Sequence, residues 1–351
     1  MSDSMKALRY YGRRDMRLED VPVPVPADDE ARLRISYASI CQTDVERWWH
    51  GPTMARWKTE PKTVGHETSG RVEAVGTNVR GLSVGDRVMV NNIRPCGVCH
   101  WCVLGSQSSC ANVNSAGFAL DGGLAEYMVW PESHLIKLPD NIPDVQTPLI
   151  EPTSVAVHAT RRTGVKVGDT VAVIGCGTVG MLTMQVLRAA GARVIAGDLR
   201  AQSLDLALKL GADAAINTGD EDALEQLMNM TDGVGADIVV ETAGAVVTPR
   251  IAINWTRPGG TTVLVGIHAN AANFDFNEIV GTERTVIGSV AASPGDMEKG
   301  IQLIADGKIL LEELVSAVIP LERVMEDGFE RMLRPEKDVF RIMVTSDYRS
   351  D

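Results

Sequence analysis

The chain has 351 residues, of which 44% are hydrophobic and 23% are charged. These proportions are typical of a folded protein with a sizeable core and exclude a disordered or collagen-like chain. The length favours two domains, and the formal net charge of −12 disfavours nucleic acid and anionic membranes as partners. Because there is no apolar run of eighteen residues and no secretory signal at the start, we expect a cytoplasmic protein without a membrane span.

The predicted elements change in character along the chain. From residue 5 to about residue 90, short β-branched runs separated by Pro and Gly predict many short strands. From residue 170 onward, apolar strand-like segments alternate with helix-length segments, which predicts parallel βαβ units in a doubly wound sheet. The final strand-like run, DVFRIMVTSD, resembles the short strand-like runs of the first part of the chain. We therefore expect an α/β fold, with a β-rich domain at 1–153 and 294–351 and a Rossmann domain inserted at 154–293.

Four of the six cysteines fall in one short lobe, at about 95–111, with the spacing C-x2-C-x2-C-x7-C. Four thiolates at this spacing can close a tetrahedral zinc site, which stabilises structure and leaves no position for chemistry. An iron–sulfur cluster fits the spacing less well, and a nucleic-acid-binding zinc ribbon would require basic flanks that this lobe lacks. The predicted ligands of this structural zinc are Cys96, Cys99, Cys102 and Cys110.

A second set of metal-binding residue types lies earlier in the chain. Cys41 stands in ICQTD, and His66 and Glu67 stand in GHETSG. Thiolate, imidazole and carboxylate together make a mixed site that can keep a coordination position open for water or substrate. On spacing alone, a lone Cys and a lone His in a β domain are more often buried structural residues.

Residues 171–180 read VAVIGCGTVG, a strand-like run that leads into G-x-G-x-x-G and a helix-length segment. These glycines permit a tight turn, a close approach to a pyrophosphate, and packing of the helix on the strand. A carboxylate at the end of the next strand, Asp198, favours NAD over NADP, a preference that Arg200 could soften. The predicted cofactor-binding residues of this turn and of the later strand ends are Gly175, Gly177, Thr178, Val179, Gly180, Asp198, Arg200, Thr242, Gly266, Ile267 and Val290.

The segments CQTD, GHETSGRVEAVG, the cysteine lobe and GCGTVG follow one another across essentially the whole chain. In this order they resemble the zinc-containing alcohol dehydrogenase branch of the medium-chain dehydrogenase/reductase superfamily, with its sorbitol, threonine and butanediol dehydrogenases. The resemblance implies a GroES-like catalytic domain in which Cys41 and His66 bind a catalytic zinc. It also implies that Glu67, and Glu151 in EPTSVAVHA, belong to the metal site, with the order of their ligation left open.

The resemblance further implies a chemistry, the transfer of a hydride between NAD and a secondary alcohol. Thr43 is implied to pass the substrate proton toward the cofactor ribose, and Asp44 to orient the His66 ring. Many relatives carry a His three residues after this Thr, where the present chain has Glu46. The end of the relay therefore stays open between Glu46, His50 and water.

Polar and aromatic residues near these motifs bear on the substrate. Asn91 and Asn92 stand where alcohol-oxidising relatives often carry bulky apolar groups, and Trp48, Trp49 and Trp57 follow Cys41. We expect a polyol, sugar derivative or vicinal diol as the small-molecule substrate. A threonine-type amino-alcohol dehydrogenase and a non-catalytic NAD-binding structural protein remain alternatives. The resemblance also implies two Zn²⁺ per chain and a homotetramer, with a dimer as the other possibility.

Overall fold

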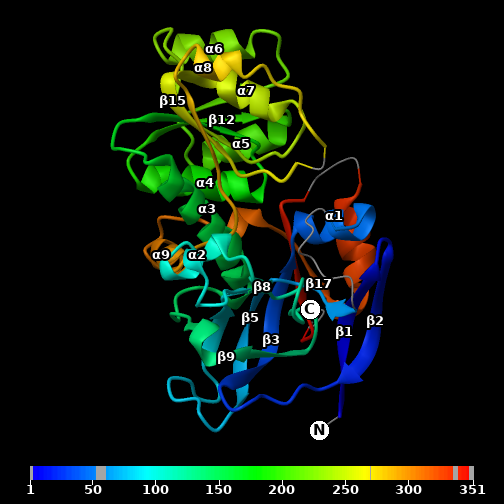
Figure 1. Cartoon of the computed structure of the whole chain (residues 1–351). Helices are drawn as coiled ribbons and strands as arrows, with labels where there is room; N and C mark the ends of the chain where they lie inside the picture. Colours follow the sequence, from blue (N-terminus) through cyan, green and yellow to red (C-terminus); the bar gives the residue numbers. More distant parts are fainter. Residues whose placement is uncertain (1–2, 53–60, 269, 335–338, 348–351) are drawn as a thin grey trace. The chain divides into compact units, whose positions relative to one another are not determined.

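The computed structural model describes residues 3–52, 61–268, 270–334 and 339–347 and divides the chain into two compact units (Figure 1). Unit 1 comprises residues 1–151 and 311–351, and unit 2 comprises residues 152–310. The chain thus leaves unit 1, completes unit 2, and then returns to unit 1.

Unit 1 is built on strands that pair antiparallel except for β17 and β18. Its largest sheet has the order β10-β6-β5-β3-β18-β17, with β9 also paired to β3, and two smaller sheets are β2-β1-β4 and β7-β8. Leu33, Trp130 and Phe329 are among the buried residues of its core. Its elements are β1 (Ser4–Gly12), β2 (Asp15–Pro22), β3 (Glu30–Ile40), α1 (Gln42–His50), β4 (Lys62–Thr63), β5 (Glu67–Val75), β6 (Arg87–Val90), β7 (Ile93–Arg94), α2 (His100–Val103), η1 (Gln107–Ser109), β8 (Asn114–Ser115), β9 (Tyr127–Pro131), η2 (Glu132–His134), β10 (Leu135–Lys137), η3 (Asp144–Leu149), η4 (Glu312–Leu314), β17 (Val315–Pro320), η5 (Leu321–Arg323), η6 (Val324–Phe329), α10 (Glu330–Met332) and β18 (Arg341–Thr345).

Helix α1 departs from the run of short strands predicted for this part of the chain. Val45 and Trp48, one turn apart, are buried in the core of unit 1 and give the segment an apolar helical face. Beside them Arg47 is also buried, with its guanidinium over the Tyr10 ring and an Nη1 hydrogen bond to Gly117 O at 2.7 Å. The consequence for the site is that Cys41 lies directly before a helix, at the end of β3.

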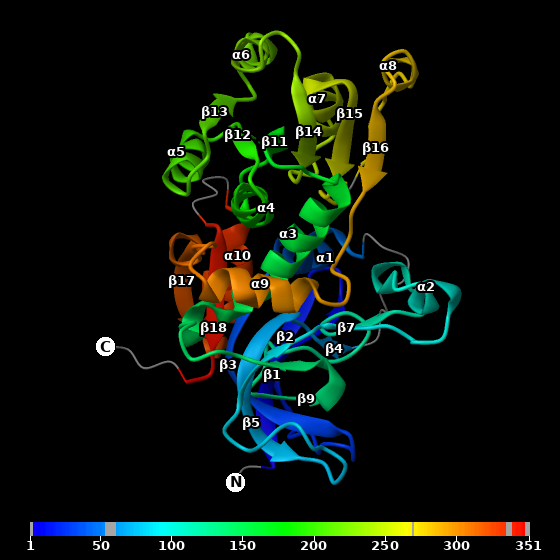
Figure 2. The ribbon, with the colours of Figure 1, turned by 90° about the vertical axis from the view of Figure 1, so that its left-hand side faces the viewer.

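Unit 2 contains a parallel sheet of six strands in the order β13-β12-β11-β14-β15-β16 (Figure 2). The strand order reverses at β11, the arrangement of a doubly wound sheet, and the predicted α/β fold class is confirmed. Helix α4 packs on β11 and β12, and α7 packs on β14 and β15. Its elements are α3 (Ile150–Thr163, which begins at the end of unit 1), β11 (Thr170–Ile174), α4 (Thr178–Ala189), β12 (Arg193–Asp198), α5 (Ala201–Lys209), β13 (Ala214–Asn217), α6 (Ala223–Met230), β14 (Ala236–Glu241), α7 (Thr248–Trp255), β15 (Thr256–Leu264), α8 (Asn277–Val280), β16 (Thr285–Gly288) and α9 (Asp296–Ala305).

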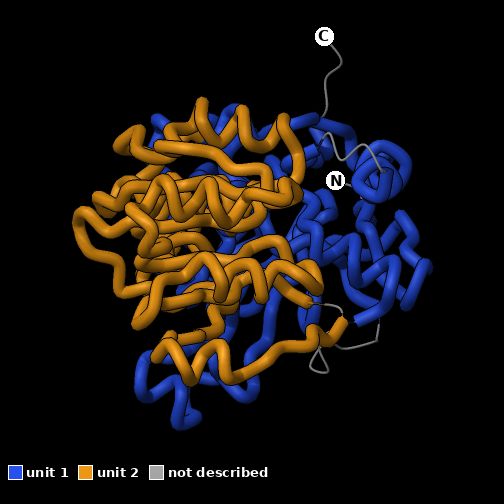
Figure 3. Tube along the Cα trace, turned by 90° about the horizontal axis from the view of Figure 1, so that it is seen from above, with its two compact units in different colours: residues 1–151, 311–351 blue, residues 152–310 orange. Residues whose placement is uncertain are grey.

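Unit 2 extends to residue 310, whereas the sequence placed its end at residue 293 (Figure 3). The additional segment contains α9, which is tied to α3 by a buried polar contact. His158 Nδ1 on α3 lies 2.9 Å from Asp296 Oδ2, and Arg161 Nη2 lies 3.1 Å from the same oxygen. A helix fixed in this way belongs to the unit that holds its partner helix.

Among the described residues, no helix combines the length and the apolar character needed to cross a bilayer.

Candidate metal and cofactor sites

Cys41 is placed by the junction between β3 and α1. Its backbone is extended, with φ −84° and ψ 147°, and it occupies the position that caps the N-terminus of the helix. Thr43, in the first turn of α1, directs its hydroxyl at the cysteine, with Oγ1 3.2 Å from Sγ. A hydroxyl that donates to the sulfur stabilises a thiolate, which is the form that binds metal.

His66 lies just before β5 and is buried. Its Nδ1 is 3.3 Å from Oδ2 of Asp44, a carboxylate on α1 with no exposed surface. Burial lowers the pKa of His66, but Asp44 and then Cys41 raise it, and the net effect is a pKa well above its usual value. Because Asp44 faces Nδ1, the other ring nitrogen, Nε2, is left for a metal. This contact supports the prediction that Asp44 orients the His66 ring.

The structure brings Cys41, His66 and Glu67 together. One ligand atom from each of the three side chains lies within 4.8 Å of the others. Sulfur, nitrogen and oxygen donors at this spacing suit zinc, and three protein donors would leave the fourth tetrahedral position open. Cys41, His66 and Glu67 therefore fit the zinc ion that the sequence predicted for them.

Glu67 is held from two sides. Its Oε2 accepts a hydrogen bond from the Ser39 hydroxyl, and its Oε1 lies 3.1 Å from Nη2 of Arg341 in β18. The Arg341 contact is an ion pair rather than an aligned hydrogen bond, since Oε1 makes no hydrogen bond within the described residues. Arg341 is 3% exposed and also donates from Nη1 to Ile40 O at 3.1 Å. Neither Ser39 nor Arg341 was singled out from the sequence; a charged residue in the otherwise apolar run FRIMV was the available signal for Arg341.

Glu151 is buried near this group but is not among the three whose donor atoms converge. Its Oε1 accepts a hydrogen bond from Asn92 Nδ2 at 3.1 Å. Burial, and then the nearby Glu67, raise the pKa of Glu151 to about 7, against a lowering by His66 and Arg341. Asn92, which the sequence suggested for the substrate pocket, is itself buried and holds Glu151, while Asn91 Oδ1 accepts from the backbone N–H of Ile93.

The other residues considered for the substrate side are placed as follows. Trp48 is buried and packs edge-on against Trp49 and Phe329. Trp57 lies outside the described residues. Glu46 Oε2 is 3.5 Å from His50 Nε2, so the two candidate ends of the proton relay lie side by side on α1.

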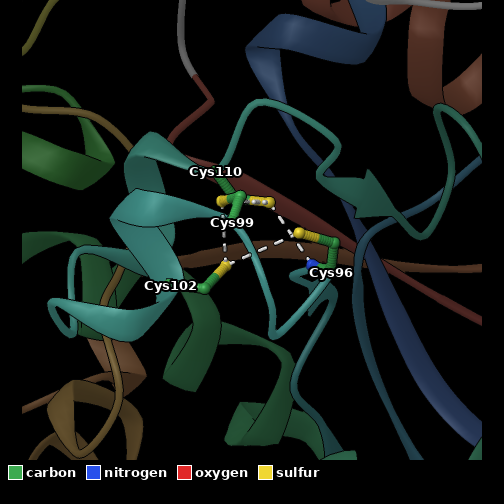
Figure 4. A group of neighbouring side chains, drawn as sticks. All are labelled: Cys96, Cys99, Cys102 and Cys110. Atoms are coloured by element: carbon green, nitrogen blue, oxygen red, sulfur yellow. Dashed lines mark hydrogen bonds between the residues drawn. The ribbon is translucent and has the colours of Figure 1, made fainter.

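The four cysteines of the lobe point their sulfur atoms toward one another (Figure 4). The sulfur of Cys102 is 4.0 Å from that of Cys96 and 3.5 Å from that of Cys99, and Cys99 Sγ is 3.9 Å from Cys110 Sγ. A tetrahedral zinc with Zn–S bonds of about 2.3 Å requires sulfur atoms about 3.8 Å apart. The pKa of the Cys99 thiol is lowered to about 6, mainly by a hydrogen bond from the backbone N–H of Cys102. Burial opposes this lowering, and a hydrogen bond from the backbone N–H of Ala111 adds to it. The lobe therefore fits a closed zinc site.

The predicted cofactor turn follows β11. Gly175 has φ +95°, and a Cβ on Gly180 would overlap the carbonyl oxygen of Gly175, so both positions require glycine. A Cβ on Gly177 would meet no atom within 4 Å, which leaves open space beside the backbone where a pyrophosphate would approach. Thr178 and Val179 begin α4, so the turn delivers the N-terminus of a twelve-residue helix.

Asp198 ends β12 beside this turn. Its Oδ2 accepts from the backbone N–H of Cys176 at 2.7 Å, and its Oδ1 accepts from the backbone N–H of Arg200 at 2.9 Å. The Arg200 side chain returns to the same carboxylate, with Nε 3.3 Å from Oδ1. The carboxylate is thereby fixed at the strand end, where ribose hydroxyls are bound in doubly wound folds.

The remaining predicted cofactor residues lie at the ends of β14, β15 and β16. Thr242 donates from Oγ1 to Gly175 O at 2.6 Å and thereby joins the β14 end to the glycine turn. Gly266 and Ile267 follow β15, and Val290 follows β16; Ile267 and Val290 are exposed within this chain. All four stand at the carboxyl edge of one parallel sheet, the edge at which such folds bind ligands.

Comparison with known proteins defines the class of protein. The alcohol dehydrogenase GroES-like domain matches residues 27–140, and the zinc-binding dehydrogenase domain matches residues 178–306. The probable D-xylulose reductase A of Aspergillus clavatus is 35% identical over 328 residues, covering 92% of this chain and 91% of that protein. The chain therefore belongs to the zinc-containing alcohol and polyol dehydrogenases of the medium-chain superfamily, as its motifs predicted.

Solved structures agree with this assignment. The 2R,3R-butanediol dehydrogenase of Bacillus subtilis superposes with a TM-score of 0.88 at 32% identity, covering 97% of this chain and 99% of that one. A putative zinc-binding dehydrogenase of Sinorhizobium meliloti 1021, bound to NADP, gives a TM-score of 0.91 at 28% identity, covering 98% and 100%. Zinc and a nicotinamide cofactor are thus the cofactors of this class, and the protein is an oxidoreductase.

Proposed function

We propose that the protein oxidises a secondary alcohol within a polyol, sugar derivative or vicinal diol to a ketone, with NAD as the acceptor. The convergence of the Cys41, His66 and Glu67 donors is the observation that carries this proposal. The relatives named for D-xylulose and 2R,3R-butanediol support the substrate class. Both compounds have the reacting carbon, as ketone or secondary alcohol, next to another carbon that bears oxygen.

Residues of unit 1 supply the proposed metal site and the exit route for the substrate proton. When bound, zinc would act as a Lewis acid toward the substrate oxygen and the nicotinamide ring would accept the hydride. Asp44 fixes the orientation of the His66 ring, and Ser39 and Arg341 hold Glu67 in place. Thr43 Oγ1 is the atom through which we propose that the substrate proton leaves.

The preference for NAD rests on Asp198. A carboxylate at this strand end accepts hydrogen bonds from both ribose hydroxyls and repels a 2′-phosphate. The ion pair with Arg200 reduces that repulsion without removing the acceptor oxygens. A solved structure of the class is bound to NADP, so the class is not restricted to NAD, and we assign the choice in this chain to Asp198 and Arg200.

A substrate screen tests the proposal. The purified protein is offered NAD with sorbitol-like polyols, 2,3-butanediol, threonine and simple primary alcohols, and NADH formation is followed by absorbance. We expect turnover of polyols or diols, and its loss in Cys41→Ser, which removes the thiolate of the donor group. Turnover of threonine alone would favour the amino-alcohol alternative, and turnover of primary alcohols alone would overturn the proposal. NAD binding without any turnover would favour the non-catalytic alternative.

We also propose two Zn²⁺ per chain, one in the Cys41 group and one in the cysteine lobe. Elemental analysis of the purified protein should give about two zinc atoms per chain. The homotetramer and the cytoplasmic location stay predictions of the sequence.

A further inference from the structure

Glu241, at the end of β14, has no exposed surface, and only one of its two carboxylate oxygens accepts hydrogen bonds from the described residues. Its Oε1 accepts from the backbone N–H groups of Ala243 and Gly244, at 2.9 and 2.7 Å, and from the Thr248 hydroxyl at 2.7 Å. These bonds shape the loop that leads from β14 into α7. Oε2, by contrast, makes no hydrogen bond within the described residues.

The loop after β15 is pressed against this β14 loop. The backbone N–H groups of Val265 and Gly266 both donate to Glu241 O, at 2.8 and 3.1 Å. A Cβ on Gly266 would lie 2.7 Å from Glu241 Oε2, so only glycine permits the two loops to come this close. The Thr242 hydroxyl, in the β14 loop, donates a hydrogen bond to Gly175 O. The β14 loop, and through it the β15 loop, is thereby connected to the glycine turn of the cofactor site.

His268 belongs to the β15 loop and faces the unused oxygen. Its Nε2 lies 3.4 Å from Glu241 Oε2, and neither ring nitrogen makes a hydrogen bond within the described part of the chain. A buried carboxylate oxygen without a donor is costly, and the imidazole N–H is the donor within reach after a small rotation of the ring. The mechanism proposed above makes no use of either residue.

We propose that His268 is a positioning residue for the nicotinamide half of the cofactor. As the tautomer that carries its proton on Nε2, it donates to Glu241 Oε2 and fixes the β15 loop, with Gly266 and Ile267, against the β14 loop. In a doubly wound sheet the glycine turn holds the pyrophosphate, and the strand ends on the other side of the switch point meet the second half of the dinucleotide. The pair therefore orders the surface for the nicotinamide ring and leaves the surface for ADP-ribose unchanged. This inference rests on the proposed cofactor.

The test compares two ligands in four proteins. Dissociation constants of NAD and of ADP-ribose, which lacks nicotinamide, are measured by calorimetry for the wild type, His268→Leu, His268→Gln and His100→Leu, the last at an exposed histidine of unit 1. We expect His268→Leu to weaken NAD about tenfold and ADP-ribose by less than about twofold, because one buried hydrogen bond is lost. His268→Gln, which keeps a side-chain N–H, should recover most of the NAD affinity, and His100→Leu should match the wild type.

The other outcomes separate the two proposals. Equal weakening of both ligands in His268→Leu, or no weakening of either, would overturn the positioning role and leave the proposed cofactor intact. A Gln variant as weak as the Leu variant would also count against it. A wild type that binds neither NAD nor ADP-ribose would overturn the proposed cofactor itself. Labelling of histidine with ¹⁵N adds an independent measurement, since the proposed pair requires the proton of His268 on Nε2.

Discussion

The proposed cofactor choice and the candidate metal centre both depend on single residues. Asp198 shows how one side chain can serve two purposes. Its carboxylate accepts hydrogen bonds from the backbone N–H groups of Cys176 and Arg200, which shapes the end of β12. The same carboxylate forms an ion pair with the Arg200 guanidinium. While the carboxylate is present, Arg200 is engaged with a negative group. Without that charge, the guanidinium becomes a partner for a 2′-phosphate.

Asp198→Asn should therefore shift the cofactor preference toward NADP. Asn keeps an acceptor for the backbone but removes the charge, so we expect the ratio of kcat/KM for NAD to that for NADP to fall about tenfold or more. The double variant Asp198→Asn/Arg200→Met should lose the gained NADP activity. Steady-state kinetics with both cofactors measures the ratio, and an unchanged ratio in Asp198→Asn would contradict the role given to this carboxylate.

The pair of Arg341 and Glu67 is a second case in which one residue cannot be changed alone. Both side chains are buried, so removal of the arginine leaves an uncompensated carboxylate. We expect Arg341→Met to cost about 3–5 kcal/mol of the free energy of unfolding, and Arg341→Met/Glu67→Gln to recover most of it. Urea denaturation of the metal-free variants measures this difference. Equal losses in the single and the double variant would show that the pair does not stabilise unit 1.

At the scale of elements, the cysteine lobe is separate from the convergent group that contains Cys41. The lobe holds its four sulfurs through local turns and the short α2, and it contributes no atom to the Cys41 group. Cys102→Ser should therefore remove one zinc per chain and lower the thermal midpoint, since binding to a structural site adds to folding stability. The affinity of unit 2 for NAD should stay within about twofold. Elemental analysis and calorimetry check both points, and a variant that keeps about two zinc atoms would argue against the lobe as a zinc site.

The elements also show which features a sequence can predict. The glycine turn, β11, β12 and the cysteine spacing are local patterns, in which nearby residues determine the geometry, and the structure has them close to where they were expected. Helix α1 was missed because Cys41 and its neighbours follow a run of strands, and only packing of Val45 and Trp48 in the core selects the helix. Ser39 and Arg341 were missed because they reach Glu67 from strands far apart in the sequence.

At the scale of the whole molecule, the discontinuous unit 1 assembles its buried polar group from distant parts of the chain. Ile40 and Glu67 come from its first segment and Arg341 from the segment after unit 2. Glu151 stands at the last residue of unit 1 before the chain enters unit 2. The groups that act on this carboxyl, among them Asn92, Glu67 and Arg341, all belong to unit 1, so its titration reports on the fold of that unit.

The raised pKa of Glu151 makes the stability of the metal-free protein depend on pH. Burial raises this pKa from 4.5 to about 7, so between these values the folded chain holds a proton that the unfolded chain has lost. The sign follows from linkage: this contribution to stability is fully present below about pH 4.5 and is lost as the pH rises to about 7, by roughly 3 kcal/mol in total. Glu151→Gln stays neutral throughout and should remove this loss, whereas Glu322→Gln, at an exposed position, should keep it. Urea midpoints measured in a chelator from about pH 5 to about pH 8 test the prediction, and parallel curves for the wild type and Glu151→Gln would show that Glu151 ionises normally in the folded chain.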